Sequence, residues 1–339
     1  MLSISITALV SCNIQPTPGV SPNLPLPPIF EDVHNLSNTP YGSGLPWLYE
    51  YAVYRSMRLG WGDTPGYLDY LRASSQETLL DTELPSTPDT ITVYRIIPPE
   101  DHYEYALDIA RRFSLTSEPT QFNSGGLTYY SFDGGLRVWS DGSISYYAGV
   151  SQGKPTYLPS REECTQIAQD WLKALALYPE NIFRIETGST TLFEDFMDDD
   201  GSMYGGAYQL TTSVYFMIGI DGYELAGAGA TVVLGDYGRI LEASIKIPEL
   251  EPYTTAAIKK PEDALALFQS YLENPADFLQ DSPAYLINIS MRMPIWDIST
   301  KYFCMINPDS AQSVYAQPVY FFNARTTINC DAIVDGLMR

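Results

Sequence analysis

The chain has 339 residues, with 19 Lys and Arg against 41 Asp and Glu, which gives a formal net charge of −22. A field of that sign repels nucleic acid and anionic lipid head groups, so the composition argues against a DNA- or RNA-binding role and against electrostatic attachment to a membrane. The length allows one large or two medium domains with a sizeable core, and the 45% of hydrophobic residues excludes disorder throughout the chain.

The first residues end in Leu9-Val10-Ser11-Cys12, an apolar run that closes on a small residue and a cysteine. This pattern predicts a bacterial lipoprotein signal over residues 1–12, with lipid attached to Cys12. No Lys or Arg precedes Cys12, so the basic n-region of a complete signal is missing, which a start codon placed too far downstream would explain. The alternative is an ordinary free or buried cysteine. The signal predicts an extracytoplasmic protein of the cell envelope, held on the membrane by lipid.

Residues 13–28 contain six prolines and no charged residue. Such a stretch cannot build a core and is typical of an extended, semi-rigid spacer, which would hold a domain off a bilayer. Residues 29–90 give mixed signals, with short helices predicted over Tyr49–Leu59 and Tyr67–Ala73. We expect them to form an irregular, partly helical N-terminal segment.

The first regular unit covers residues 91–157. It opens with a strand rich in β-branched residues over Ile91–Ile97, followed by a helix whose apolar face carries Tyr103, Ala106, Leu107, Ala110 and Phe113. A polar loop comes next. Three short strands then follow, separated by Asp-Gly pairs that favour hairpins: Leu127–Phe132, Leu136–Trp139 and Ser143–Tyr147.

The second unit, residues 158–250, repeats this order. Its helix begins at Pro159-Ser160 and its apolar stripe is Cys164, Ile167, Ala168, Trp171, Leu172 and Leu175. Its strands are predicted at Ile182–Glu186, Tyr208–Ile220, Tyr223–Leu234 and Ile240–Ile247. The third unit, residues 251–339, has a helix from Lys260-Pro261 and strands at Tyr285–Arg292, Lys301–Ile306 and Pro318–Asn323.

Each unit is thus a helix opened by proline and followed by an antiparallel meander, which indicates divergent internal duplication. The expected fold class is α+β, with tandem helix-plus-antiparallel-meander modules and helices packed on one face of each sheet.

This pattern resembles the extracytoplasmic modules of the YycH/YycI-type regulatory proteins and the related PEPSY-like domains over about residues 91–330. The resemblance rests on Val93–Pro99 leading into the Ala106-xxx-Ala110 helix, on the helix from Pro159, and on the Gly-rich strand pair from Tyr215 to Leu234. It implies contacts with proteins at the cell surface, as regulators of sensor kinases or peptidases. YycH/YycI-type proteins are usually held by a transmembrane helix, whereas this chain would be held by lipid. The resemblance transfers no functional residue.

Three cysteines remain besides Cys12. Cys304 and Cys330 lie in strand-like contexts and could form a disulfide, whereas Cys164 lies on a predicted helix and is expected to be a small core residue. The sequence has no CxxC motif and no Cys/His cluster, so it gives no support for a zinc or iron–sulfur site. We expect no cofactor.

Three motifs that suggest catalysis fail on their context. The G-x-S-x-G motif around Ser151 lacks a following helix and any later histidine. His102 and Glu104 match the H-x-E of zinc deaminases without the cysteine pair. Gly227-Ala228-Gly229 lacks the third glycine of a dinucleotide loop, and its expected role is to flatten a strand or allow close packing.

Carboxylates leave two possibilities open. Asp198, Asp199 and Asp200 could bind calcium, although the EF-hand pattern fails and a solvated acidic loop is the alternative. A pair of carboxylates could also serve a hydrolase, but with 41 acids in the chain the presence of a pair carries little weight.

The 26 tyrosines are typical of a β-rich fold with half-exposed strands, or of an aromatic binding surface. The leading hypothesis is therefore a non-catalytic envelope lipoprotein that binds a protein or peptide partner. A surface protein that binds carbohydrate or a small molecule is the alternative, and a carboxylate-dependent hydrolase comes third.

Overall fold

The computed structural model describes residues 83–124, 127–149, 154–197, 203–266, 284–286, 295–306, 314–324 and 330–337. The predicted signal, the spacer and the two predicted N-terminal helices lie outside these ranges. Among the described residues, no helix is long and apolar enough to cross a membrane.

The described chain is mostly β, with fourteen strands, the α-helices α3 and α4, and a short helical stretch at residues 261–266. The first part of the chain forms β1 (Thr90–Ile97), α3 (His102–Arg112), β2 (Thr120–Ser124), β3 (Leu127–Ser131), β4 (Leu136–Trp139), β5 (Ile144–Tyr147) and α4 (Arg161–Ala174). The middle part forms β6 (Ile182–Met197), β7 (Met203–Ile220), β8 (Tyr223–Leu234), β9 (Ile240–Lys246) and β10 (Glu249–Ala257). Helical residues 261–266 follow, and then β11 (Ala284–Leu286), β12 (Ile295–Ile306), β13 (Val314–Ala324) and β14 (Cys330–Asp335).

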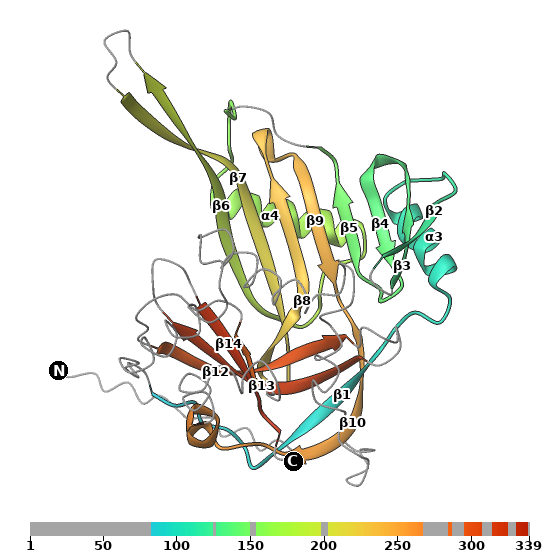
Figure 1. The fold of residues 1–339 in the computed structure, drawn as a ribbon. Helices are drawn as coiled ribbons and strands as arrows, with labels where there is room; N and C mark the ends of the chain where they lie inside the picture. Colours follow the sequence, from blue (N-terminus) through green and yellow to red (C-terminus); the bar gives the residue numbers. More distant parts are fainter. Residues whose placement is uncertain are drawn as a thin grey trace, which may run out of the picture.

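All fourteen strands belong to one mixed sheet, ordered β10-β1-β13-β12-β8-β9-β5-β4-β3-β2, with β6, β7, β11 and β14 paired off this path (Figure 1). The expected fold class of tandem helix-plus-meander modules is therefore wrong. Strands pair across the boundaries of the predicted units, as β1 does with β10 and β13, and β5 with β9. Local hairpin signals cannot reveal such pairs, because the partners are far apart in the sequence.

Strand β8 joins the part of the sheet that contains β12, β13, β1 and β10 to the part that contains β9, β5, β4, β3 and β2. Its first part pairs in parallel with β12 at Leu225 and Ala226, and its second part, from Gly229 on, pairs with β9. The strand therefore passes from one hydrophobic core to another. The β1 core contains Val93, Ile218, Leu225, Tyr302 and Tyr320 among others, and the helix core contains Ala110, Leu136, Leu172, Phe216 and Val232 among others.

Two glycines lie at the passage between these cores. Gly227 and Gly229 have φ values of 81° and 127°, which side chains with a Cβ rarely adopt. A Cβ on Gly229 would also collide with the carbonyl oxygen of Phe216 on β7. The expected role of the Gly227-Ala228-Gly229 segment in close packing is confirmed.

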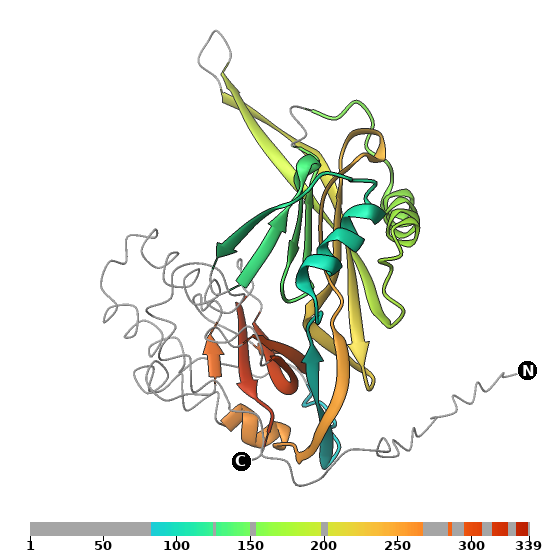
Figure 2. The ribbon, with the colours of Figure 1, turned by 90° about the vertical axis from the view of Figure 1, so that its right-hand side faces the viewer.

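Helices α3 and α4 cover the same side of the sheet, over β4 and over β7 and β8 (Figure 2). Each begins at a side-chain cap: Asp101 accepts from two backbone N–H groups of α3, and Ser160 and Glu163 form a reciprocal capping box on α4. Cys164, Ala168 and Leu172 are fully buried on the inner face of α4, so the expected core role of Cys164 is confirmed.

The Asp-Gly turns are confirmed as hairpin connections. Asp221 and Gly222 join β7 to β8 with positive φ at both positions, 52° and 83°, as a type I′ turn requires. The pairs at Asp133-Gly134 and Asp141-Gly142 connect β3 to β4 and β4 to β5.

Pro318 lies inside β13, where a proline usually disrupts a sheet. The neighbouring strand changes at this point: β1 pairs with residues up to Ala316, and β14 begins to pair at Val319. The missing N–H of Pro318 falls between the two partners, and its carbonyl oxygen accepts from Gly336 N at 3.0 Å. The strand tolerates proline because no ladder bond is lost there.

Candidate binding surface on the open face of the sheet

The side of the sheet opposite the helices carries a row of aromatic rings over β2, β3 and β4. Phe122 pairs with Tyr129, and Tyr129 pairs with Trp139, so the three side chains share one face in adjacent strands. The ring centroids of Phe122 and Tyr129 are 5.1 Å apart at an interplanar angle of 17°, and those of Tyr129 and Trp139 are 4.6 Å apart at 38°. We call these three residues the aromatic ladder.

Strand alternation explains why the ladder faces away from the core. Tyr130 and Val138 point to the helices and are buried in the helix core, so their neighbours Tyr129 and Trp139 point the other way. Phe122 is 44% exposed, although a phenylalanine gains most by burial. The guanidinium of Arg137 lies 5.8 Å from the centroid of the Tyr129 ring, which places a cation beside the ladder.

The geometry of the ladder limits what it can bind. Its rings face one another, so the faces of Tyr129 are partly covered by its neighbours, and the row presents ring edges together with the outer face of Phe122. A sugar usually stacks on a broad, exposed ring face. The ladder instead offers ring edges and, at the end of the row, one free ring face. These suit the aromatic side chains of another polypeptide, because aromatic pairs prefer offset or edge-to-face contacts.

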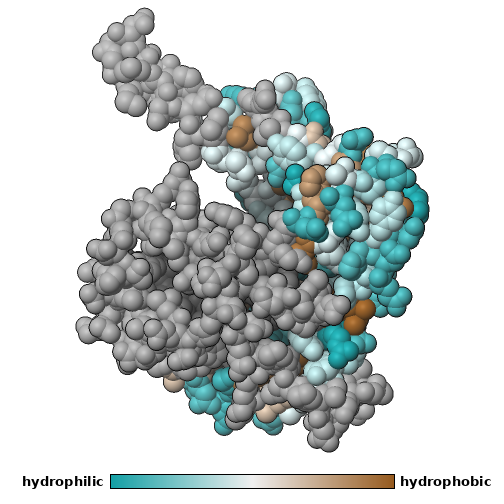
Figure 3. Space-filling model, turned by 45° about the vertical axis from the view of Figure 1, so that its right-hand side comes forward, coloured by the Kyte–Doolittle hydropathy of each residue, from teal (hydrophilic) through white to brown (hydrophobic). Residues whose placement is uncertain are grey.

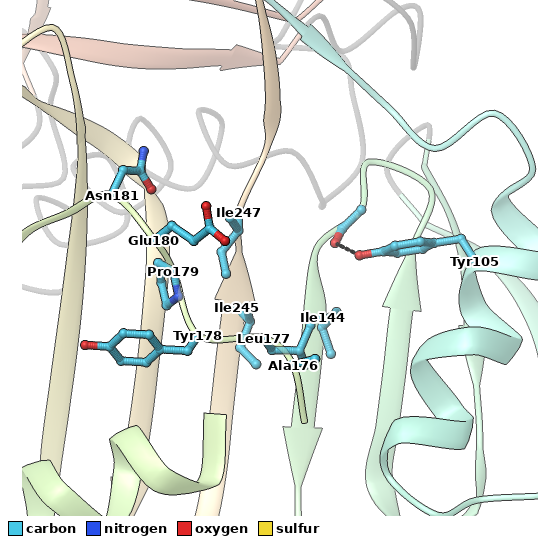
Figure 4. A pocket seen from close by; sticks show the side chains of 11 residues that line it. Tyr105, Ile144, Ala176, Leu177, Tyr178, Pro179, Glu180, Asn181, Ile245 and Ile247 are labelled. Carbon is cyan, nitrogen blue, oxygen red and sulfur yellow. Dashed lines mark hydrogen bonds between the residues drawn. The ribbon is translucent and has the colours of Figure 1, made fainter. Parts of the chain in front are cut away.

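A groove of about 420 Å³ opens at the end of the helix layer (Figure 4). Its floor is formed by Ile144, Ile245 and Ile247, and its walls by Tyr105 on α3 and by the segment after α4 that includes Tyr178 and Glu180. A groove with an apolar floor and a polar wall could hold a small apolar group.

Two of the polar side chains in this groove already have hydrogen-bond partners. The Tyr105 hydroxyl donates to the carbonyl oxygen of Gly142 at 3.1 Å, and burial raises the pKa of Tyr105. The Asn181 amide donates to the carbonyl oxygen of Gly219 at 2.7 Å. Glu180 is the single carboxylate in the lining, whereas glycoside hydrolysis needs two. The groove therefore offers packing and one negative charge, without the paired acids of a hydrolase.

The predicted site residues are scattered. Cys12, Ser151 and Asp198 to Asp200 lie outside the described residues. His102 and Glu104 lie in the first turn of α3, and within the described part no group of three or more His, Cys, Asp or Glu could hold a metal ion.

The structure does not bring Cys304 and Cys330 together. Cys304 on β12 is opposite Ala316, and Cys330 on β14 is opposite Ala324. Both partners lie on β13, so the cysteines are near opposite ends of that strand, whereas a disulfide needs Cα atoms within about 7 Å.

The aromatic ladder was missed at the sequence level because residues 114–126 read as a polar loop. The signal that could have revealed it is Gly125-Gly126 between Phe122-Asn123-Ser124 and Leu127, a pair typical of two-residue hairpin loops. With β2 recognised, alternation would have placed Phe122 and Tyr129 on one face.

No protein-family model matches the chain, and no curated protein matches it. The surface chemistry of the chain is therefore the basis for assigning a role. In the view of Figure 3 the described surface is mainly hydrophilic, with hydrophobic residues in small separate patches.

Proposed function

We propose that this chain is a non-catalytic cell-envelope lipoprotein, anchored through Cys12, that binds a protein or peptide partner at the aromatic ladder. The observation that carries the proposal is the row of stacked rings, half-exposed at Tyr129 and Trp139, on the face of the sheet that α3 and α4 do not cover. Tyrosine, tryptophan and arginine are enriched where proteins bind one another, because each combines a large contact area with a polar group.

Two features favour a polypeptide partner over the alternatives. The mutual stacking of the rings leaves few free faces for a sugar, which weakens the carbohydrate alternative. The groove at the end of the helix layer has one carboxylate, which gives no support for a carboxylate-dependent hydrolase. A thermal-shift screen tests the carbohydrate alternative: one sugar class that raises the melting temperature would favour it.

The test of partner binding compares three proteins in cross-linked membranes: the wild type, Phe122→Ala and Phe183→Ala. Phe183 is the matched control, because it is 46% exposed and lies at the start of β6, which among the described strands pairs with β7 alone and is far from β2 in the strand order. We expect a reproducible partner with the wild type and with Phe183→Ala, and its loss with Phe122→Ala. Equal recovery with both variants, or no reproducible partner, would contradict the proposal.

The anchor is tested separately. Mass spectrometry of the membrane fraction should find diacylglycerol on Cys12, and Cys12→Ser should release the protein from the membrane. An unmodified Met1 on the membrane-bound protein would overturn the proposed localisation. It would not test partner binding at the aromatic ladder.

A further inference from the structure

We propose that β2 is a docking edge, on which an extended peptide of the partner adds as a further antiparallel strand. The inference rests on the proposed function and specifies how the partner is held: by backbone hydrogen bonds to β2, with the aromatic ladder selecting one side chain. Strand addition to a sheet edge combines affinity from the main chain with selectivity from alternate side chains.

The backbone of β2 has hydrogen-bonding groups with no partner among the residues that the structure describes. On β3, Thr128 N donates to Ser140 Oγ at 3.3 Å, and Thr128 O accepts from Ser140 N at 2.8 Å, so both groups point away from β2. Two residues directly opposite each other in an antiparallel pair either both direct their backbone N–H and C=O toward the partner strand or both direct them away from it. Asn123 is opposite Thr128, so its backbone groups also point outward, away from β3. By alternation Gln121 does the same. Within the described ranges no strand pairs with this side of β2.

This edge lacks the features that usually prevent pairing. Natural edges are protected by charged residues, proline or a bulge. The edge strand β10 has Glu249, Glu251 and Pro252, and its pairing with β1 contains a register shift. Strand β2 reads Thr-Gln-Phe-Asn-Ser, with no charge and no proline, and its pairing with β3 is regular over all five residues. The exposed edge is therefore competent to pair.

The side chains around β2 indicate which peptide fits. A residue opposite Phe122 would lie against the outer face of the ladder, which favours an aromatic ring there. The two flanking residues, opposite Gln121 and Asn123, would point to the helix side. On that side the Tyr103 hydroxyl donates to Glu118 at 2.7 Å, and the ring of Tyr103 contacts that of Tyr130. The carboxylate of Glu118 on that side, on a chain of net charge −22, favours basic flanking residues.

The probe is the synthetic peptide Thr-Lys-Phe-Lys-Thr, acetylated and amidated, titrated into the purified protein and followed by NMR. If it adds as a strand, the two lysine N–H groups point to β2 and the phenylalanine N–H points away. N-methylation of both lysines should therefore weaken binding at least ten-fold, whereas N-methylation of the phenylalanine should change it less than two-fold. The peptide Lys-Lys-Thr-Thr-Phe has the same composition and charge, and it should bind at least ten-fold more weakly.

Variants of the protein test the same edge from the other side. Gln121→Pro removes an outward N–H and no β2–β3 hydrogen bond, and Gln121→Ala is the control that keeps the N–H. We expect at least ten-fold weaker binding of the peptide for Gln121→Pro and near wild-type binding for Gln121→Ala, with similar melting temperatures.

The possible results separate this inference from the proposed function. Binding that is lost with Phe122→Ala but insensitive to N-methylation and to Gln121→Pro would overturn strand addition and leave the ladder as the contact surface. Binding insensitive to all three changes would count against both. If the protein alone forms a dimer that Gln121→Pro dissociates, the edge pairs with a second copy, and the peptide proposal is wrong.

Discussion

The hydroxyl group of Tyr302 donates to the main-chain carbonyl oxygen of Thr92 at 2.7 Å, although 210 residues separate them. The same hydroxyl lies 3.3 Å from a carboxylate oxygen of Asp221, to which Tyr94 donates at 2.7 Å. The ring of Tyr302 is fully buried and makes edge contacts with those of Tyr94 and Tyr223. One side chain thus connects β12, β1 and the β7–β8 turn.

Tyr302→Phe should lower the free energy of unfolding by about 1–3 kcal/mol, because the part-buried carbonyl oxygen of Thr92 loses this donor. Urea denaturation at pH 7 measures this. Tyr237→Phe is the control, since Tyr237 is 68% exposed, and it should be within about 0.5 kcal/mol of the wild type. Equal stability of the two variants would show that the hydrogen bond is dispensable.

The same residue predicts a loss of stability at alkaline pH. Burial, with the nearby Asp221 carboxylate, raises the pKa of Tyr302 above the usual 10.0. A raised pKa means that the folded state favours the neutral phenol. The contribution of Tyr302 to the free energy of unfolding is therefore complete below pH 10. It falls as the pH rises further, because the tyrosine then ionises in the unfolded chain first. Tyr302→Phe should reduce the slope of stability against pH above that point. An unchanged slope would show that the loss of stability at alkaline pH comes from other ionisable groups.

Gly229→Ala tests the passage of β8 between the two cores. A residue with a Cβ at φ 127° is strained by about 1–3 kcal/mol, and the collision with the Phe216 carbonyl oxygen adds to that cost. Gly206→Ala is the matched control, because Gly206 also lies in a strand and its Cβ would meet nothing within 4 Å. The melting temperature should fall clearly for Gly229→Ala only. Similar values for both variants would show that the segment adapts.

The capping box of α4 predicts a change at acidic pH. Hydrogen bonds from Ser160 lower the pKa of Glu163 below its usual 4.5, so its carboxylate stabilises the fold above that pH and loses this effect as the pH falls. Glu163→Gln should be less stable than the wild type at pH 7, and the difference should shrink as the pH falls below 4.5. Ser160→Ala should cost about 1 kcal/mol at pH 7. A difference between Glu163→Gln and wild type that does not change with pH would contradict this account.

Glu224 holds two cations, and its side chain is 13% exposed. Lys301 lies 3.2 Å and Arg184 3.4 Å from the same carboxylate oxygen. Glu224→Gln should cost about 1–3 kcal/mol, because a largely buried Lys301 loses its counter-charge. Glu251→Gln, which removes the exposed pair with Arg95, should cost less than about 1 kcal/mol and less still in high salt. Equal costs in denaturation experiments would show that the burial of Glu224 has no effect.

Local signals predicted the local elements. The strand at Ile91–Ile97, the helix that buries Ala106 and Ala110, and the helix that buries Cys164 and Leu172 are confirmed, because each depends on residues close in the sequence. The predicted ends were less accurate. Strand β6 was expected to end at Glu186 and extends to Met197, where it pairs with the lengthened β7.

The candidate site depended on strand β2, which the polar composition of residues 114–126 concealed, although the pair Gly125-Gly126 is a local signal for its hairpin with β3. The start of α4 at Pro159-Ser160 and the Asp221-Gly222 turn follow from residues close in the sequence, and the sequence predicted both. It indicated close packing at Gly229 as one possible role, but not that Phe216 of β7 is the group approached. The contact between Tyr302 and Thr92, the position of Pro318 between two partner strands and the outward edge of β2 follow from which strands lie side by side. Tertiary structure decided these, because a strand leaves half of its hydrogen-bonding groups to each neighbour, and the core selects that neighbour.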